Sequence, residues 1–281
     1  MRTAAQSSQD DSSPACIDSL RSVHAKIMAS PAANRAEILG AISEQLHACI
    51  DSLGAFSGEF AALDFMGVIT SQDQRLRIWT WNAPMDDRTC LYAGLVAHRP
   101  EKSSRNQGAG GPVDLYDLAA ADSREAPALQ LSYNQENWPG ALYYAMAPNP
   151  TRNGIYTLLG WDAGDGRVTR KSVEPLQIKD GQLRFGAAIF ESSGQRYILE
   201  YRDQVQVTLR HEPREKRRPE RIVFDHLAPA APHLQGVTAF YGPDLTFDAL
   251  VLDGKIWRLE TDVSAIQPLN GQPFIDPRQA P

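Results

Sequence analysis

Asp225 and His226 are the neighbouring residues with the greatest capacity for chemistry in this sequence. An imidazole can accept or donate a proton near neutral pH and can also bind a metal ion. Neighbours in a strand point to opposite faces, so His226 would need a carboxylate from elsewhere, such as Asp162 or Asp244. The plainer interpretation is that Asp225 and His226 satisfy backbone groups where a strand ends at a proline-rich loop.

A second set of candidates lies in the segment Asp162-Ala163-Gly164-Asp165-Gly166. Carboxylates that ring a tight glycine turn are typical of calcium loops. The EF-hand spacing is absent, because the twelfth position counted from Asp162 is Val173 and not a glutamate. Asp162 and Asp165 are therefore candidate metal ligands, and a plain β-turn is the alternative interpretation of the segment.

Three aromatic residues, Trp138, Trp161 and Tyr241, are candidates for binding. If they came together, their flat rings would offer a stacking platform for the apolar faces of sugars. Aromatic residues in strands usually serve instead as core residues, because they bury a large apolar area. The sequence leaves both possibilities open.

The net charge of −6 and the sequence pI near 5.5 give no electrostatic reason to expect nucleic acid as a partner. The one basic cluster, residues 210–221, is interleaved with glutamates and broken by prolines, which is typical of an exposed loop. The sequence contains no G-x-S-x-G, H-E-x-x-H, P-loop or dinucleotide-binding motif. We therefore predict no cofactor.

Apolar residues at three- and four-residue steps predict two helices between Ile17 and Leu53. Pro31 interrupts them, Asn34 is a plausible N-cap of the second helix, and Gly54 marks its end. If the helices fold back on each other, Cys16 and Cys49 lie opposite each other at the open end.

A disulfide between Cys16 and Cys49 would close a loop of roughly 30 residues and stabilise the fold by about 3 to 4 kcal/mol. Such a bond favours an oxidising compartment. Two reduced core cysteines are the alternative. The third cysteine, Cys90, is left over, and no C-x-x-C metal motif is present.

From Leu63 onward the apolar period changes to two, and short turns separate one alternating segment from the next. The predicted strands include 66–70, 75–81, 90–98, 141–147, 155–161, 197–210 and 221–226. Asp-Gly pairs at Asp180 and Asp253 are strong hairpin signals. The predicted class is α+β, mainly β, with an antiparallel helix pair packed on a large meandering antiparallel sheet, barrel or sandwich.

The predicted organisation is a flexible leader over residues 1–15, a helical hairpin over 16–54, an antiparallel β domain over 63–267 that shares a single core with the helices, and a flexible tail over 268–281. No stretch is long and apolar enough to span a membrane, and no signal peptide is visible. We expect a periplasmic or exported protein if a signal peptide was removed, and a cytoplasmic one otherwise.

Four short sequence segments resemble segments of a known group of proteins. They are Arg77-Ile78-Trp79-Thr80-Trp81-Asn82, Tyr156-Thr157-Leu158-Leu159-Gly160-Trp161-Asp162, Ile222-Val223-Phe224-Asp225-His226-Leu227 and Phe240-Tyr241-Gly242-Pro243-Asp244. Through them the chain from about Leu63 to Val263 resembles a family of uncharacterised, usually exported bacterial β-rich proteins. The resemblance implies export and no particular activity.

These observations favour a non-catalytic binding or scaffolding protein of the bacterial envelope, whose partner is an unidentified protein or a glycan. The alternative is a hydrolase or metal-dependent enzyme centred on His226 with Asp225, Asp162 or Asp244. A cleft that contains His226 and two carboxylates would favour the enzyme.

Overall fold

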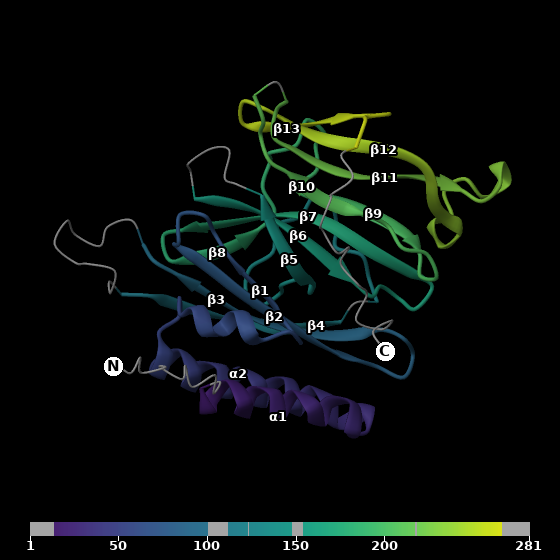
Figure 1. Ribbon diagram of the computed structural model, residues 1–281. Helices are drawn as coiled ribbons and strands as arrows, with labels where there is room; N and C mark the ends of the chain where they lie inside the picture. Colours follow the sequence, from purple (N-terminus) through teal and green to yellow (C-terminus); the bar gives the residue numbers. More distant parts are fainter. Residues whose placement is uncertain (1–13, 101–111, 123, 148–153, 217, 266–281) are drawn as a thin grey trace, which may run out of the picture.

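Two helices cover one face of a stack of three antiparallel β-sheets (Figure 1). The computed structural model describes residues 14–100, 112–122, 124–147, 154–216 and 218–265. The predicted leader, apart from its last two residues, and the predicted tail from residue 268 lie outside the described residues. The predicted class, mainly β with an N-terminal helix pair, is confirmed.

The helix pair consists of α1 (Ala15–Ala29) and α2 (Arg35–Leu53), which the short helix η1 (Ala32–Asn34) connects. Asn34 stands at the predicted N-cap position, but its side chain makes no capping hydrogen bond. The predicted apolar face is confirmed, because the buried side chains of α2 are Leu39, Ile42, Leu46, Cys49 and Ile50. This face packs on the first sheet because its apolar surface must leave water.

The first sheet contains β1 (Gly67–Thr70), β2 (Leu76–Pro84), β3 (Cys90–His98) and β4 (Asp114–Asp122), and the short helix η2 (Gly58–Ala62) precedes it. In β2 the side chains alternate as predicted. Trp79 and Trp81 pack with the helices, and Leu76 and Ile78 face the second sheet. Strand β4 was not predicted from the sequence.

The second sheet contains β5 (Leu142–Ala147), β6 (Ile155–Asp162), β7 (Val168–Lys179), β8 (Gln182–Phe185) and β9 (Tyr197–Arg202). Strand β7 is long enough to pair with β8 near its end and with β9 near its start. The predicted turn between β7 and β8 is confirmed, since Asp180 and Gly181 have φ angles of 52° and 75°.

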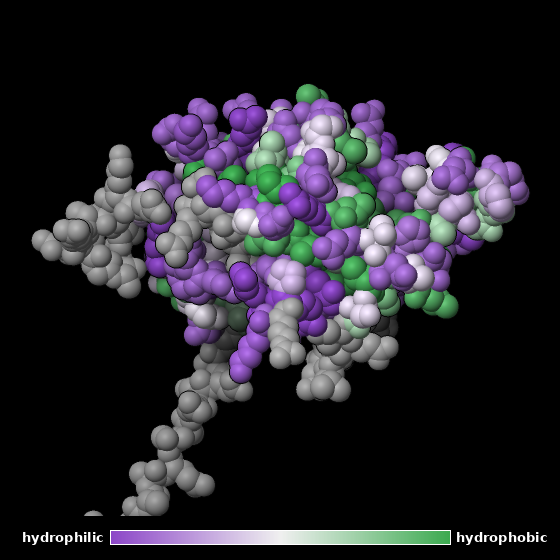
Figure 2. Space-filling view, turned by 90° about the horizontal axis from the view of Figure 1, so that it is seen from above, coloured by the Kyte–Doolittle hydropathy of each residue, from purple (hydrophilic) through white to green (hydrophobic). Residues whose placement is uncertain are grey.

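The third sheet contains β10 (Leu209–Glu212), β11 (Arg221–Pro229), β12 (Tyr241–Asp253) and β13 (Ile256–Glu260). The short helices η3 (Pro232–Leu234) and η4 (Thr238–Phe240) connect β11 to β12. Figure 2 views the molecule from the side of this sheet, where apolar side chains gather near the centre and hydrophilic ones surround them.

Apolar clusters fill the spaces between successive layers: one joins the helices to the first sheet, and the next two join the first sheet to the second and the second to the third. Hydrogen bonds also cross between sheets, from Tyr143 N to Thr80 Oγ1 (2.9 Å) and from the Tyr144 hydroxyl to the Leu209 carbonyl (2.9 Å). The strands thus form several stacked sheets, which are not closed into a barrel.

Candidate ligand-binding cavity

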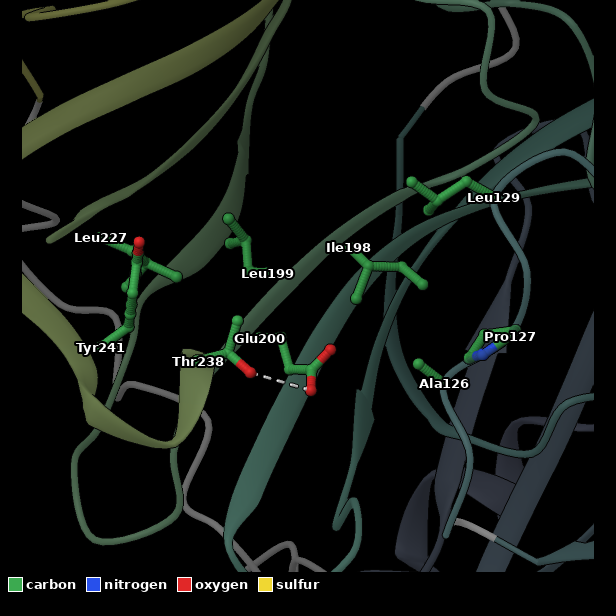
Figure 3. Close-up of a pocket in the computed structure, with 9 residues that line it drawn as sticks. All are labelled: Ala126, Pro127, Leu129, Ile198, Leu199, Glu200, Leu227, Thr238 and Tyr241. Atoms are coloured by element: carbon green, nitrogen blue, oxygen red, sulfur yellow. Dashed lines mark hydrogen bonds between the residues drawn. The ribbon is translucent and has the colours of Figure 1, made fainter. Parts of the chain in front are cut away.

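A cavity of about 360 Å³ lies beside β9, where the second and third sheets meet the loop after β4 (Figure 3). Most of its lining is apolar. The lining residues are Ala126, Pro127, Leu129, Ile198, Leu199, Glu200, Leu227, Thr238 and Tyr241. A cavity of this size, with few polar groups among apolar ones, is typical of a small-molecule site.

Strand β9 forms the base of the cavity. It pairs with β7 over the whole length from Tyr197 to Arg202, so its backbone is held along one edge. Ile198 and Glu200 are two residues apart and therefore lie on the same face of the strand. In Figure 3 both side chains extend between the two groups of residues that form the walls.

One wall is the loop segment 126–129, and the buried Arg196 holds this loop in place. The Arg196 guanidinium donates to the carbonyls of Ala128 and Leu131, the latter at 2.7 Å. The backbone N–H of Gln195 donates to the Leu129 carbonyl at 2.7 Å. The loop is irregular in backbone conformation, but these bonds fix its carbonyl groups.

Glu174 of β7 compensates the charge of Arg196. Its carboxylate accepts hydrogen bonds from Arg196 Nε (2.8 Å) and Nη2 (3.2 Å), and both side chains are almost fully buried. Burial raises the pKa of Glu174 to about 7, and the guanidinium opposes that shift. The pair is a fixed, neutralised support behind the wall of the cavity.

The opposite wall comes from the third sheet and the connection before β12. It contains Leu227, Thr238 and Tyr241. The Tyr241 hydroxyl accepts a hydrogen bond of 2.9 Å from the Gly236 backbone N–H, which fixes the position of the ring. Tyr241 was a predicted binding residue, and it does line the cavity.

Glu200 is the charged side chain of the cavity. Its Oε1 accepts a hydrogen bond from Thr238 Oγ1 at 3.1 Å, and its Oε2 lies 3.8 Å from Arg170 Nε. Arg170 also donates to Asp162 Oδ2 at 3.0 Å. Burial raises the pKa of Asp162 to about 6 against the effect of Arg170. Two carboxylates therefore share one guanidinium at this place.

Asp162 and Asp165, the predicted metal ligands, have other partners. Asp162 is buried against Arg170 and the Gly164 N–H, while Asp165 Oδ1 accepts from the backbone N–H groups of Arg167 and Val168. This is the hydrogen bonding of a turn. Within the described residues no three His, Cys, Asp or Glu side chains are grouped to hold a metal ion.

Trp138 and Trp161 are both 1% exposed and pack between the first and second sheets. Tyr241 lies on the other side of the second sheet, at the start of β12 in the third sheet. The structure therefore does not bring the three aromatic residues together, because the two tryptophans serve as core residues.

His226 lies at an interruption of the pairing between β11 and β12. Asp225 pairs with Phe247, and the next pair is Leu227 with Pro243, so His226 stands opposite a three-residue bulge. Such bulges redirect side chains. His226 Nδ1 lies 2.8 Å from Asp248 Oδ2, and this hydrogen bond raises the pKa of His226.

The carboxylate partner of His226 is thus Asp248, which sequence reasoning missed. Asp225 instead accepts a hydrogen bond from the Thr208 N–H, and Asp244 accepts from the N–H and hydroxyl of Thr246. His226 is not among the residues that line the cavity. The pair of His226 and Asp248 can hold a proton, and the charge of Asp244, one of the three carboxylates first considered, also raises the pKa of His226.

Cys16 and Cys49 are neighbours, as the helical hairpin predicts, but both are free thiols in the structure. Ser52 Oγ contacts both residues, 3.9 Å from Cys16 Sγ and 3.1 Å from the Cys49 carbonyl. Burial and the adjacent Cys16 thiol raise the pKa of Cys49 to about 12. The expected disulfide is therefore not formed here, although its two residues lie side by side.

Sequence reasoning missed Glu200, Thr238 and the loop wall of the cavity. The alternation in β9 could have placed Ile198 and Glu200 on one face, but no local signal indicates which distant segments cover that face. A cavity assembled from four separate segments leaves no motif in the sequence.

No protein-family model, curated protein or solved structure matches the chain. Among the described residues, no helix has the length and apolar character needed to cross a membrane.

Proposed function

We propose that this is a non-catalytic binding protein that holds a small ligand in the cavity beside β9. The observation that carries the proposal is a cavity of about 360 Å³ whose lining is apolar except for the Glu200–Thr238 pair. The buried support of one wall by Arg196 favours binding without rearrangement, because preorganised walls lower the entropic cost of association.

The alternative function, a hydrolase or metal-dependent enzyme centred on His226, receives less support. The hydrogen bond to Asp248 orients the imidazole, which is a favourable feature for acid–base chemistry. However, His226 does not line the cavity. A binding function uses the cavity directly, whereas the enzyme would need a substrate site elsewhere.

A ligand screen with a blocked cavity tests the proposal. Leu129 lines the cavity and is 47% exposed, so Leu129→Trp fills space at its entrance with little expected effect on folding. Leu131 is 56% exposed and is not a lining residue, so Leu131→Trp is the matched control. Small compounds would be screened for an increase in melting temperature of the full chain.

We expect some compounds to stabilise the wild type and Leu131→Trp but not Leu129→Trp. A ligand at 100 times its Kd stabilises the folded state by about 2.7 kcal/mol. If no compound stabilises the wild type, or if the compounds stabilise Leu129→Trp equally, the proposed cavity function is wrong.

We also propose that the protein is exported to the bacterial envelope, as its resemblance to the exported family implies. The adjacency of Cys16 and Cys49 supports this location, because a bond between them would join α1 to α2 in an oxidising compartment. Mass mapping of the native protein without reduction tests it. Free thiols at both positions would contradict the disulfide.

A further inference from the structure

We propose that the ligand of the cavity is a small organic cation, in which an apolar body carries one protonated amine that binds at Glu200. The inference rests on the proposed binding function and specifies the ligand's chemical class. Its basis is one carboxylate, only partly neutralised, in an otherwise apolar lining.

The apolar part of the lining surrounds Glu200 on several sides. Ile198 lies on the same strand face, Leu129 and Pro127 come from the loop wall, and Leu227 comes from the third sheet (Figure 3). These side chains form no hydrogen bonds with a ligand, so they favour hydrocarbon through the removal of apolar surface from water. The body of the ligand is therefore expected to be apolar.

The charge balance around Glu200 favours a cation. Arg170 is the nearest cationic partner, at 3.8 Å from Glu200 Oε2, and it lies closer to Asp162, at 3.0 Å. One guanidinium against two carboxylates gives this group a net charge of −1 when both are ionised. Arg202, the next residue on that face of β9, donates to the Gln204 side chain and is not among the residues that line the cavity.

The geometry leaves the Glu200 carboxylate able to accept hydrogen bonds from a ligand. The Thr238 hydroxyl occupies one site on Oε1, and a carboxylate has about four acceptor sites on its two oxygens. Glu200 is partly exposed, at 28% of its side chain, so a ligand can reach it. A protonated amine supplies up to three donors together with a positive charge.

Tyr241 adds a second feature that suits a cation. Its hydroxyl is fixed by the Gly236 N–H, and its ring lines the same cavity as Glu200. Aromatic faces attract ammonium groups through their quadrupole. An anionic ligand would instead be repelled by Glu200, and a neutral alcohol would lose the charge interaction.

Three probes that share one hydrocarbon chain separate these possibilities. Binding of hexylammonium, 1-hexanol and hexanoate to the full chain would be measured by isothermal calorimetry at neutral pH. The variants are Glu200→Gln, which removes the charge and keeps the shape, and Glu191→Gln as control. Glu191 is a 60% exposed carboxylate that pairs with Arg258 outside the cavity.

We expect hexylammonium to bind the wild type at least about 10-fold more tightly than 1-hexanol, and hexanoate to bind more weakly than both. Glu200→Gln should reduce hexylammonium affinity to that of the alcohol, whereas Glu191→Gln should leave it unchanged. Unfolding curves of both variants would confirm that each is folded.

Equal affinity for the amine and the alcohol would overturn the assignment, as would unchanged hexylammonium binding in Glu200→Gln. The same conclusion follows if none of the three probes binds. The screen with Leu129→Trp then distinguishes the two proposals. If that screen identifies compounds that bind in the cavity, the proposed binding function stands and only the proposal of a cationic ligand is wrong.

Discussion

Removal of the Arg196 guanidinium, just before β9, is expected to be among the most damaging single changes next to the second sheet. The side chain is 1% exposed, and its guanidinium donates to the Glu174 carboxylate and to the carbonyls of Ala128, Leu131 and Phe185. Arg196→Met keeps an apolar chain of similar length but leaves a buried carboxylate without its counter-charge. Breaking a buried pair in this way costs about 3 to 5 kcal/mol.

Urea unfolding followed by circular dichroism measures this cost. The control is Arg258→Met, because Arg258 is 55% exposed and pairs with Asp253 on the surface at 2.9 Å. Exposed ion pairs contribute at most about 1 kcal/mol, so the control should lose no more than that. An Arg196→Met variant no less stable than Arg258→Met would refute the reasoning.

Two further measurements test the cause of the loss. Glu174→Leu combined with Arg196→Met removes both buried charges, so the double variant should lose less stability than the sum of the single variants. The pKa of Glu174 is raised from 4.5 to about 7, and loss of Arg196 should raise it further. Titration of the unfolded chain is common to the wild type and the variant, so the cost of Arg196→Met should grow as pH rises above about 7, where Glu174 ionises in the folded wild type but not in the variant. An additive double variant, or a cost independent of pH, would contradict this explanation.

Three more substitutions have defined outcomes. The hydrogen bond to Asp248 raises the pKa of His226 above 6.5, and it stabilises the fold by less than about 1 kcal/mol because the pair is partly exposed. This stabilisation is fully present below pH 6.5 and is lost as pH rises through the raised pKa of His226. Unfolding of His226→Asn at several pH values should lack this component, and an unchanged pH profile would refute the explanation. Gly67→Ala should cost about 1 to 3 kcal/mol, because the new methyl group would overlap the Tyr143 carbonyl. Gly40→Ala in α2 places its methyl group where no atom lies within 4 Å, so it should stabilise the fold by about 0.5 to 1 kcal/mol. Thermal unfolding should therefore show a lower melting temperature for Gly67→Ala and a higher one for Gly40→Ala, and any other result would contradict the packing.

The helices and most strands could be predicted because their cause is local. Leu39, Ile42 and Leu46 recur at three- and four-residue steps, and each is buried in α2. The strand predicted at 90–98 is β3 with the same bounds. In both elements one face must be removed from water, and the spacing of apolar residues along the sequence shows which face that is.

Strands whose existence or bounds depend on pairing with a segment distant in the sequence were missed or given the wrong bounds. Strand β4 contains three aspartates and three alanines, which have low β propensity, and it exists because it pairs with β3. The alternating run 197–210 was predicted as one strand. The chain turns after Arg202 and passes from the second sheet to the third, so β9 and β10 belong to different layers.

In the candidate site, too, some residues could be predicted from the sequence and others could not. Tyr241 was identified as a binding candidate, but its expected partners Trp138 and Trp161 are core residues between other layers. Asp248 lies 22 positions from His226, and it reaches His226 because pairing of β11 with β12 places it opposite Phe224, two residues away on the same strand face. No local pattern indicates such a meeting.

By itself, the sequence determined the class of this protein: a helical hairpin with Cys16 beside Cys49, followed by antiparallel strands joined by short turns. Only the tertiary structure decided that these strands form three stacked sheets and that a cavity opens beside Glu200. Hydrophobic periodicity acts along the chain and fixes each element, whereas the two walls of the cavity come from segments that are 98 residues apart at the closest, between Leu129 and Leu227. Their meeting depends on how whole layers pack, and that information is not held by any one segment.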